Sequence, residues 1–299
     1  MSFLSKISEG RNDFASYALT ICLVIFSYGF LGSLPLLIDL RLSGTSFDEM
    51  MSIEHMTRIL GKNRLLIHLL LPFFFIFGSL LVGIKYFHKR SIRSFFTSAT
   101  SFRWKRFFTT FFLWWVIMSL FLVISFQTSS DLKWNFNWSN FWPLLLISFA
   151  MIPIQTTAEE LFFRGYLAKA FYQKTGSVLH TILITSILFA SMHAFNPEVA
   201  TLGYGILVYY FLTAIFLAIM TVMDNGMELS MGYHAANNVF TAIMITNNWQ
   251  AFQTDAVFID TATPTFGIDS ILTLVIVQPL FLLLLSKMYK WNNWKKLVK

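Results

Sequence analysis

Two adjacent carboxylates interrupt a strongly apolar chain. Glu159 and Glu160 lie in the segment IPIQTTAEELFFRGYLAKAFY, followed by Arg164, while hydrophobic residues make up 56% of the sequence and charged residues 12%. A carboxylate inside a bilayer is costly unless it is paired or hydrated, so ionisable residues in apolar segments are candidates for function. Residues four apart share a helix face, which predicts that Glu160 pairs with Arg164 and that Glu159 points about 100° away.

The same residues allow two purely structural interpretations. Thr157 and Glu160 fit the S/T-x-x-E pattern of a capping box at a helix start. Glu160 and Arg164 could instead be a plain ion pair that holds a loop at the membrane surface. Neither interpretation gives the glutamates a chemical role.

Two later apolar segments carry histidines. His193 lies in ILFASMHAF, with Phe189 one turn earlier on the same helix face. His234 and Asn238 lie in MGYHAANNVF and also share a face, although Asn237 is a near-equal geometric candidate. The structural alternatives are an interfacial histidine in the first segment and polar helix–helix contacts in the second.

Taken together, these residues supply an acid, a base and an amide donor from three helices. A carboxylate assisted by a histidine can deprotonate a water molecule. A second histidine and an amide NH₂ can stabilise the oxyanion that forms on an attacked carbonyl. These are the parts of a water-activating amidase site. The sequence contains neither a G-x-S-x-G elbow nor an H-E-x-x-H motif.

The elements that position these residues are predicted to be membrane-spanning helices. Mean hydropathy is +0.62, and each apolar run is close to the ~20 residues that a spanning helix needs. The eight predicted spans are about 17–39, 65–87, 107–126, 140–158, 178–195, 203–223, 229–247 and 268–286.

The basic residues predict the orientation of these spans. Seventeen of the 22 Lys and Arg residues lie in the terminal segments and in the loops that follow every second span. The positive-inside rule therefore places both termini in the cytoplasm. The net charge of +7 is a topology signal of this kind and does not indicate a nucleic-acid partner.

The predicted fold is an all-α polytopic membrane protein with eight transmembrane helices. We expect a single membrane domain over 1–299, in which 1–139 holds three spans, 140–247 the catalytic core helices, and 268–299 the last span and a basic tail. The expected location is the cell membrane of a prokaryote, as a multi-pass integral protein.

The ordered motifs resemble those of the CPBP family, the CAAX-protease and bacteriocin-processing membrane proteins also called the Abi family. The matching motifs are Glu-Glu-x-x-x-Arg at Glu159, Phe-x-x-x-His at Phe189 and His-x-x-x-Asn at His234, and the segment Arg-Gly-Tyr-Leu from Arg164 is similar to the family's usual continuation. The resemblance covers about residues 140–245, whereas residues 1–130 and the last span carry no matching signature.

The resemblance implies a glutamate-dependent intramembrane endopeptidase that needs no metal or other cofactor. By matching positions, Glu159 with His193 would activate water, and His234 with Asn238 would form the oxyanion hole. Glu160 with Arg164 would be the structural pair that orients the helix. The implied partners are the lipid bilayer and a membrane-associated peptide or protein substrate, such as a prenylated CAAX protein or a processed peptide.

Two other functions remain open at this point. Glu159, His193 and His234 would also make a two-histidine, one-carboxylate zinc site with an open position, as in a membrane metal hydrolase. A non-catalytic immunity factor, scaffold or transporter could keep the same polar cluster for helix contacts or permeation.

A site that contains both Glu159 and His193 requires a long fourth helix. If the fourth span ended at residue 158, Glu159 would lie at the cytoplasmic edge and His193 roughly 22 Å deeper, since a helix rises about 1.5 Å per residue. The two can meet only if 140–172 is one long helix, tilted or kinked at Pro153, beside a water-filled cavity open to the cytoplasm.

Overall fold

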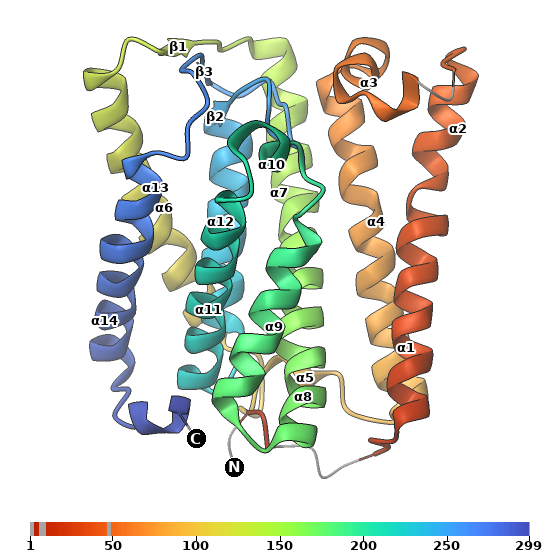
Figure 1. Cartoon of the computed structure of the whole chain (residues 1–299), viewed down its shortest axis with the longest axis vertical. Coiled ribbons are helices and arrows are strands. Elements are labelled where there is room, and N and C mark those ends of the chain that lie inside the picture. Colours follow the sequence, from red (N-terminus) through yellow and green to blue (C-terminus); the bar gives the residue numbers. More distant parts are fainter. Residues whose placement is uncertain (1–2, 6–9, 47–48, 299) are drawn as a thin grey trace.

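The apolar runs form helices, as expected where backbone polar groups have no water to bind. The computed structural model describes residues 3–5, 10–46 and 49–298. Within this part of the chain, eight helical segments run along the long axis, and both ends of the chain lie at the same end of the bundle (Figure 1).

The helical elements, in chain order, are α1 (Phe14–Phe26), η1 (Ser27–Gly32), α2 (Leu34–Leu42), η2 (Glu49–Met51), α3 (Ile53–Leu60), α4 (Lys62–Val82), η3 (Gly83–Phe87), α5 (Arg93–Phe96), α6 (Trp104–Thr128), α7 (Trp138–Glu160), η4 (Leu161–Leu167), α8 (Ala168–Thr175), α9 (Val178–Met192), α10 (Pro197–Leu202), α11 (Ile206–Asp224), α12 (Glu228–Met244), α13 (Ile268–Leu272), η5 (Thr273–Val277), α14 (Gln278–Tyr289) and η6 (Trp294–Val298). The elements η1, η3, η4 and η5 are π-helical segments within longer helices.

Six segments in the described part of the chain are long and apolar enough to cross a membrane. They are Phe14–Leu42, Lys62–Phe87, Trp104–Thr128, Trp138–Thr175, Ile206–Asp224 and Ser270–Tyr289. The fifth and seventh predicted spans correspond to shorter helices, α9 with 15 residues and α12 with 17. The all-α, multi-pass architecture is confirmed, and eight crossings with cytoplasmic termini stay a prediction.

The fourth predicted span continues well beyond residue 158. α7, η4 and α8 form one helical segment of 38 residues, Trp138–Thr175. Pro153 lies inside α7 without ending it, and the helix changes to a π-helical segment only at η4. The long fourth helix that the site requires is therefore confirmed, and it carries Glu159 about 24 Å from the end of α8.

α12 is the central helix of the bundle. It packs against α6, α7 and α11, and most of its side chains are buried. α7 also packs against α4, which pairs with α1 at one side of the molecule (Figure 1). α9 packs against α8 and α11. The polar faces of α7 and α12 are thereby brought together inside the protein.

One small sheet accompanies the helices in the described part of the chain. β1 (Leu132–Trp134), β2 (Ile245–Thr246) and β3 (Phe258–Asp260) form a three-stranded sheet in the order β1-β3-β2, antiparallel between β1 and β3 and parallel between β2 and β3. It lies at the end of the bundle opposite the chain termini (Figure 1). The sheet ties the loop before α7 to the loop after α12, close to where these two helices meet.

The close packing of α12 on α6 depends on a glycine. A Cβ atom at Gly232 would collide with the backbone carbonyl of Phe107 in α6. The backbone cannot yield as a flexible side chain could, so any larger residue must push the two helices apart.

We expect Gly232→Ala to lower the free energy of unfolding by about 1–3 kcal/mol, because it overpacks this contact. The measurement is the thermal unfolding midpoint of the detergent-solubilised protein. Gly78→Ala is the matched control, since Gly78 lies in α4 with open space around its Cβ position. Equal midpoints for the two variants would contradict the account of this contact.

Candidate functional site

The centre of the site is a buried ion pair on the long fourth helix. Arg164 donates from its guanidinium to Oε1 of Glu160 at 3.1 Å, and the two side chains are 2% and 0% exposed. The guanidinium also lies 4.4 Å from the ring centroid of Phe189 in α9 and donates to the carbonyl of Ala214 in α11. One arginine therefore joins three helices.

The geometry overturns both structural alternatives for this pair. Glu160 is the last residue of α7, and the helix continues through η4, so Thr157 and Glu160 do not form a capping box at a helix start. The complete burial of Glu160 and Arg164 also excludes a surface ion pair. The predicted pairing itself is present, in the interior of the bundle.

His234 of α12 lies between the two glutamates. Its Nδ1 is 3.0 Å from Oε1 of Glu160, and its Nε2 is 3.4 Å from Oε2 of Glu159. A carboxylate that already accepts from arginine can only accept from the imidazole, so Nδ1 carries a hydrogen and points at Glu160. This contact orients the ring and leaves Nε2 facing Glu159, whose side chain is 14% exposed.

The asparagines of α12 face different neighbours. Asn238 donates from Nδ2 to Oε1 of Gln155 at 3.3 Å, so it faces α7 one turn from His234. Asn237 accepts from the indole of Trp114 in α6 at 3.3 Å and donates to Asn238. Of the two candidates, Asn238 therefore lies on the side of the glutamates.

Gln155 is a site residue that sequence reasoning missed. It is buried and precedes Glu159 by one helical turn, so the two share the face of α7 that meets α12. A polar residue four positions before the glutamate in an apolar run was the signal that could have found it.

His193 lies at the end of α9, and its role in water activation stays a prediction. It caps the C-terminus of α9, where its Nδ1 lies 2.8 Å from the carbonyl oxygen of Phe189 and its ring stacks on Tyr210 at a centroid distance of 4.3 Å. In the described part of the chain no hydrogen bond joins His193 to Glu159. The ring of Phe189 lies between the two histidines, 4.7 Å from His193 and 6.2 Å from His234.

The segment that follows Arg164 is explained by packing. Gly165 leaves no room for a side chain, since a Cβ atom there would lie 2.8 Å from the carbonyl oxygen of Phe95.

The hydroxyl of Tyr166 is 2.8 Å from Nε2 of His88, and Nδ1 of His88 is 2.8 Å from the carbonyl of Arg11. Burial lowers the pKa of His88, consistent with a neutral ring that accepts from the tyrosine and donates to the carbonyl.

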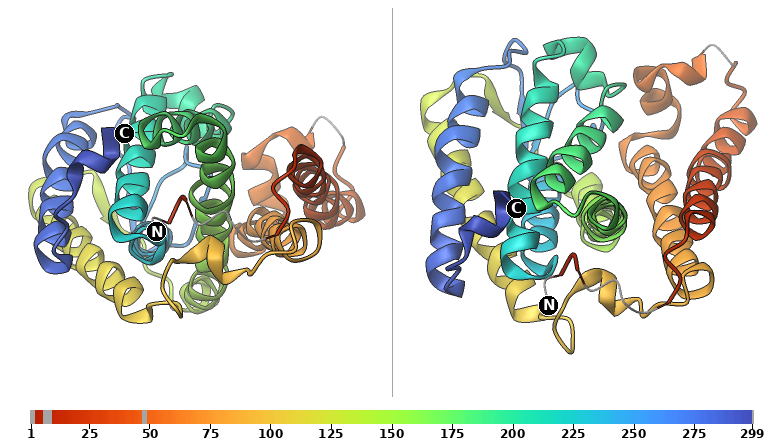
Figure 2. Two further views of the ribbon diagram at one scale, coloured as in Figure 1. Left: turned by 90° about the horizontal axis from the view of Figure 1, so that it is seen from below. Right: turned by 60° about the horizontal axis from the view of Figure 1, so that its bottom comes forward.

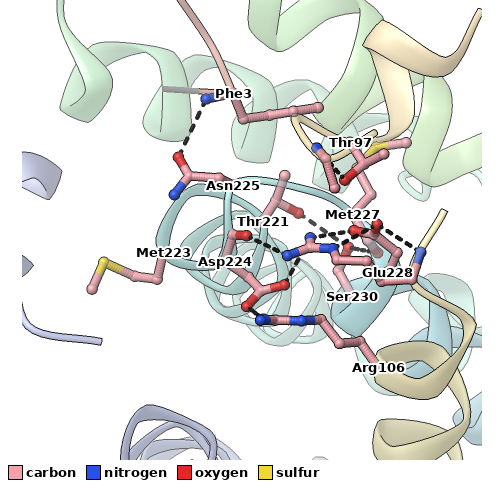
Figure 3. Close-up of polar contacts among 12 residues, drawn as sticks. Phe3, Thr97, Arg106, Thr221, Met223, Asp224, Asn225, Met227, Glu228 and Ser230 are labelled. Carbon is pink, nitrogen blue, oxygen red and sulfur yellow. Dashed lines mark hydrogen bonds and ion pairs between the residues drawn. The ribbon is translucent and has the colours of Figure 1, made fainter. Parts of the chain in front are cut away.

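A second charged cluster lies near the chain termini. Arg103 binds Glu228 through Nε at 2.8 Å and Asp224 at 2.9 Å, and Arg106 also pairs with Asp224. Figure 3 shows these side chains converging at the turn between α11 and α12. Their charges are mutually paired, so this cluster fixes the turn beneath α12 and offers no free carboxylate for chemistry.

The three residues of the zinc alternative are not grouped in this arrangement. Glu159 and His234 are adjacent, and neither is hydrogen-bonded to His193 in the described part of the chain. Among the described residues, no three His, Cys, Asp or Glu side chains are grouped to hold a metal ion.

The fold and site together define a multi-pass helical membrane protein with a glutamate–histidine cluster inside the bundle. Residues 138–240 match the Rce1-like family, described as type II CAAX prenyl endopeptidase Rce1-like. The match extends from the start of α7 into α12 and so includes both glutamates, both histidines and Asn238. It confirms the predicted resemblance to the CPBP family.

The chain is also similar to a protein of Bacillus subtilis (strain 168) described as "Uncharacterized protein YyaK". The two are 33% identical over 167 residues, which are 55% of this chain and 56% of that protein. The similarity thus spans little more than half the length of this relative. No solved structure matches the chain.

The buried ion pair predicts a difference between the two glutamates. We expect Glu160→Gln to lower the free energy of unfolding by about 3–5 kcal/mol, because it leaves the Arg164 guanidinium buried without its partner. Glu159→Gln is the matched control and should change stability much less, since Glu159 is partly exposed and does not bind Arg164 directly. Thermal unfolding in detergent measures both.

A second substitution checks the cause. Adding Arg164→Met to Glu160→Gln removes the unpaired charge and should recover part of the lost stability. Equal unfolding midpoints for Glu160→Gln and Glu159→Gln, or no recovery in the double variant, would contradict this description of the pair.

Proposed function

We propose that this protein is an intramembrane endopeptidase that hydrolyses a peptide bond of a membrane-associated substrate by attack of water. The observation that carries the proposal is the contact of Glu159 with His234 beside the Glu160–Arg164 pair, all inside an apolar helical bundle. The match of residues 138–240 to a CAAX prenyl endopeptidase family supports this reaction class.

Glu159 is the proposed general base. It is partly exposed, it is not neutralised by direct contact with Arg164, and Nε2 of His234 can exchange a proton with its carboxylate. The base accepts a proton from water as the water oxygen attacks the substrate carbonyl carbon. The same proton then passes to the departing amine, which completes hydrolysis without a covalent enzyme intermediate.

His234 and Asn238 are the proposed oxyanion donors. Asn238 uses one amide hydrogen to bind Gln155, and its NH₂ group retains a second for a substrate oxygen. Nε2 of His234 faces Glu159, so a hydrogen on this atom would lie beside the proposed point of water attack. Donors held in place before the reaction stabilise the tetrahedral intermediate with little reorganisation.

His193 retains a proposed assisting role in water activation. Helix length supports this role, since Glu159 and His193 are each about 22–24 Å along their helices from the turn that joins α8 to α9. Its Nε2 is the ring nitrogen not engaged by Phe189. A bound water or substrate between the two side chains would connect them, as catalytic contacts often tighten only when substrate binds.

We further propose eight crossings with both termini in the cytoplasm of a prokaryotic cell. The described part of the chain has eight helical segments, the same number as the predicted spans. Both termini lie at one end of the bundle, which supports an even number of crossings (Figure 1). The basic loop that contains α5 lies at the end of the bundle where the termini are found.

Single cysteines test this topology on a Cys22→Ser background. A membrane-impermeant maleimide added to intact spheroplasts should label Asn248→Cys, which is exposed after α12, and should label Thr100→Cys, which is exposed before α6, only after lysis. The reverse pattern would contradict the proposed orientation.

Substitution of Glu159 tests the reaction. In purified, reconstituted protein, Glu159→Gln should reduce cleavage of a membrane-peptide library by about 10²–10⁴-fold, the usual contribution of a general base, while the protein stays folded. Mass spectrometry of the released fragments is the measurement. Full cleavage by Glu159→Gln would contradict the catalytic role of Glu159. Absence of cleavage by the unmodified protein would instead favour the non-catalytic immunity, scaffold or transport alternative.

Chelation separates the proposed mechanism from the zinc hydrolase. Cleavage should persist in phenanthroline. Loss of cleavage with phenanthroline and its return with zinc would overturn the metal-independent mechanism.

A further inference from the structure

The short segment 3–5 lies inside the helical bundle. Phe3 and Leu4 are 1% and 2% exposed, although the positive-inside rule predicts that the N-terminus lies in the cytoplasm. Viewed from the end that carries the termini, this segment enters the ring of helices (Figure 2). It thus occupies the interior on the side from which the predicted cytoplasmic cavity should open.

Side chains of the bundle bind both backbone polar groups of Phe3, which lies in a turn. Asn225 accepts from the amide of Phe3 at 3.3 Å, and Lys169, which is fully buried, donates to its carbonyl (Figure 3 shows the Asn225 contact). Both polar groups of one residue are therefore held by side chains, one from α8 and one from the turn between α11 and α12.

The side chain of Phe3 has a specific contact as well. The ammonium of Lys169 lies 4.0 Å from the centroid of the Phe3 ring, within the range of a cation–π interaction. A buried lysine that binds both a backbone carbonyl and the adjacent aromatic ring favours an aromatic residue at this position.

Leu4 connects this binding site to the buried ion pair. Leu4 and Arg164 line one cavity, together with Thr185 of α9 and Val222 of α11. With Leu4 in place the cavity has a volume of about 10 Å³, room for about one water molecule. The leucine therefore fills the space next to the arginine that holds Glu160.

We infer that this cavity is a binding site for a peptide segment with an aromatic residue followed by an aliphatic one, held in the turn conformation of residues 3–5, and that residues 3–5 occupy it as a displaceable internal ligand. Release of this segment opens the interior as far as Arg164. The identity of the ligand as a peptide substrate rests on the proposed function, whereas the occupancy and its release do not.

Thiol labelling tests the release. On a Cys22→Ser background, Thr185→Cys places a thiol in the wall of the cavity, where it should react slowly with a water-soluble maleimide in detergent. Replacing Phe3 and Leu4 by alanine should raise the rate by about tenfold or more, because a buried site otherwise reacts only through local opening. Phe14→Ala, at an 88% exposed position, is the control and should leave the rate unchanged.

A synthetic peptide tests the binding specificity. The hexapeptide MSFLSK, which has the sequence of residues 1–6, should restore slow labelling to the variant with alanines at Phe3 and Leu4. The matched peptide MSAASK should not. Lys169→Met keeps an apolar side chain and removes both contacts of Lys169 to Phe3, so it should also raise the labelling rate. It provides an independent test if the variant with alanines at Phe3 and Leu4 fails to fold.

Two outcomes would overturn the inference. The first is that neither Lys169→Met nor the alanine variant changes the labelling rate of Thr185→Cys. The second is that MSFLSK and MSAASK slow the labelling equally. Labelling does not depend on catalysis and can be measured in Glu159→Gln. Failure of the peptide site therefore appears as unchanged labelling. Failure of the proposed function appears as no cleavage by the unmodified protein, and failure of its proposed base as full cleavage by Glu159→Gln.

Discussion

The arrangement of the site depends on one buried ion pair, Glu160 with Arg164. Two charges removed from water are tolerated only when each finds hydrogen-bonding partners, and removal of either leaves the other uncompensated. Oε1 of Glu160 accepts from Arg164 and from His234, whereas its Oε2 has no hydrogen-bond partner among the described residues. Arg164 contacts Phe189 and the Ala214 carbonyl. The requirement to satisfy these charges holds the long fourth helix, α9, α11 and α12 in one mutual position.

The ion pair also makes the surroundings of the two neighbouring carboxylates, Glu159 and Glu160, different. Glu160 is enclosed and its contacts are structural, whereas Glu159, turned away by about 100° along the helix, keeps partial exposure and faces Nε2 of His234. The π-helical segment η4 begins directly after Glu160 and contains Arg164. Such segments are frequent at functional sites, and here it lies where the ion pair and the close approach of Gly165 to Phe95 must both be accommodated.

Much of this architecture follows from the sequence because it rests on local periodicity. The i, i+4 spacing of Glu160 and Arg164 predicts their pairing, and the depth of His193 predicts a fourth helix that extends past residue 158. The strands escaped prediction because they are two or three residues long and are stabilised by partners distant in the chain. No local pattern could show that Phe3 lies inside the bundle, because Lys169 and Asn225 meet it only in three dimensions.

The placement of His193 shows the same limit at the site itself. Helix lengths predict its depth, but the direction of its ring depends on the end of α9 and on stacking with Tyr210. Likewise, spacing alone left Asn237 and Asn238 equivalent, and their neighbours Trp114 and Gln155 distinguish them. Periodicity thus predicts which residues can share a site, whereas tertiary packing decides which of them touch.

The central claim is that Glu159 and His234 act as one catalytic unit, and a double-mutant cycle on peptide cleavage tests it most directly. The single-turnover rate of library cleavage would be measured for Glu159→Gln, His234→Gln and the variant with both changes. When two residues act as one unit, replacing either one already removes the contribution of both to the rate. The double variant should therefore be no slower than the slower single variant. Multiplicative losses, or cleavage retained in either single variant, would contradict the claim.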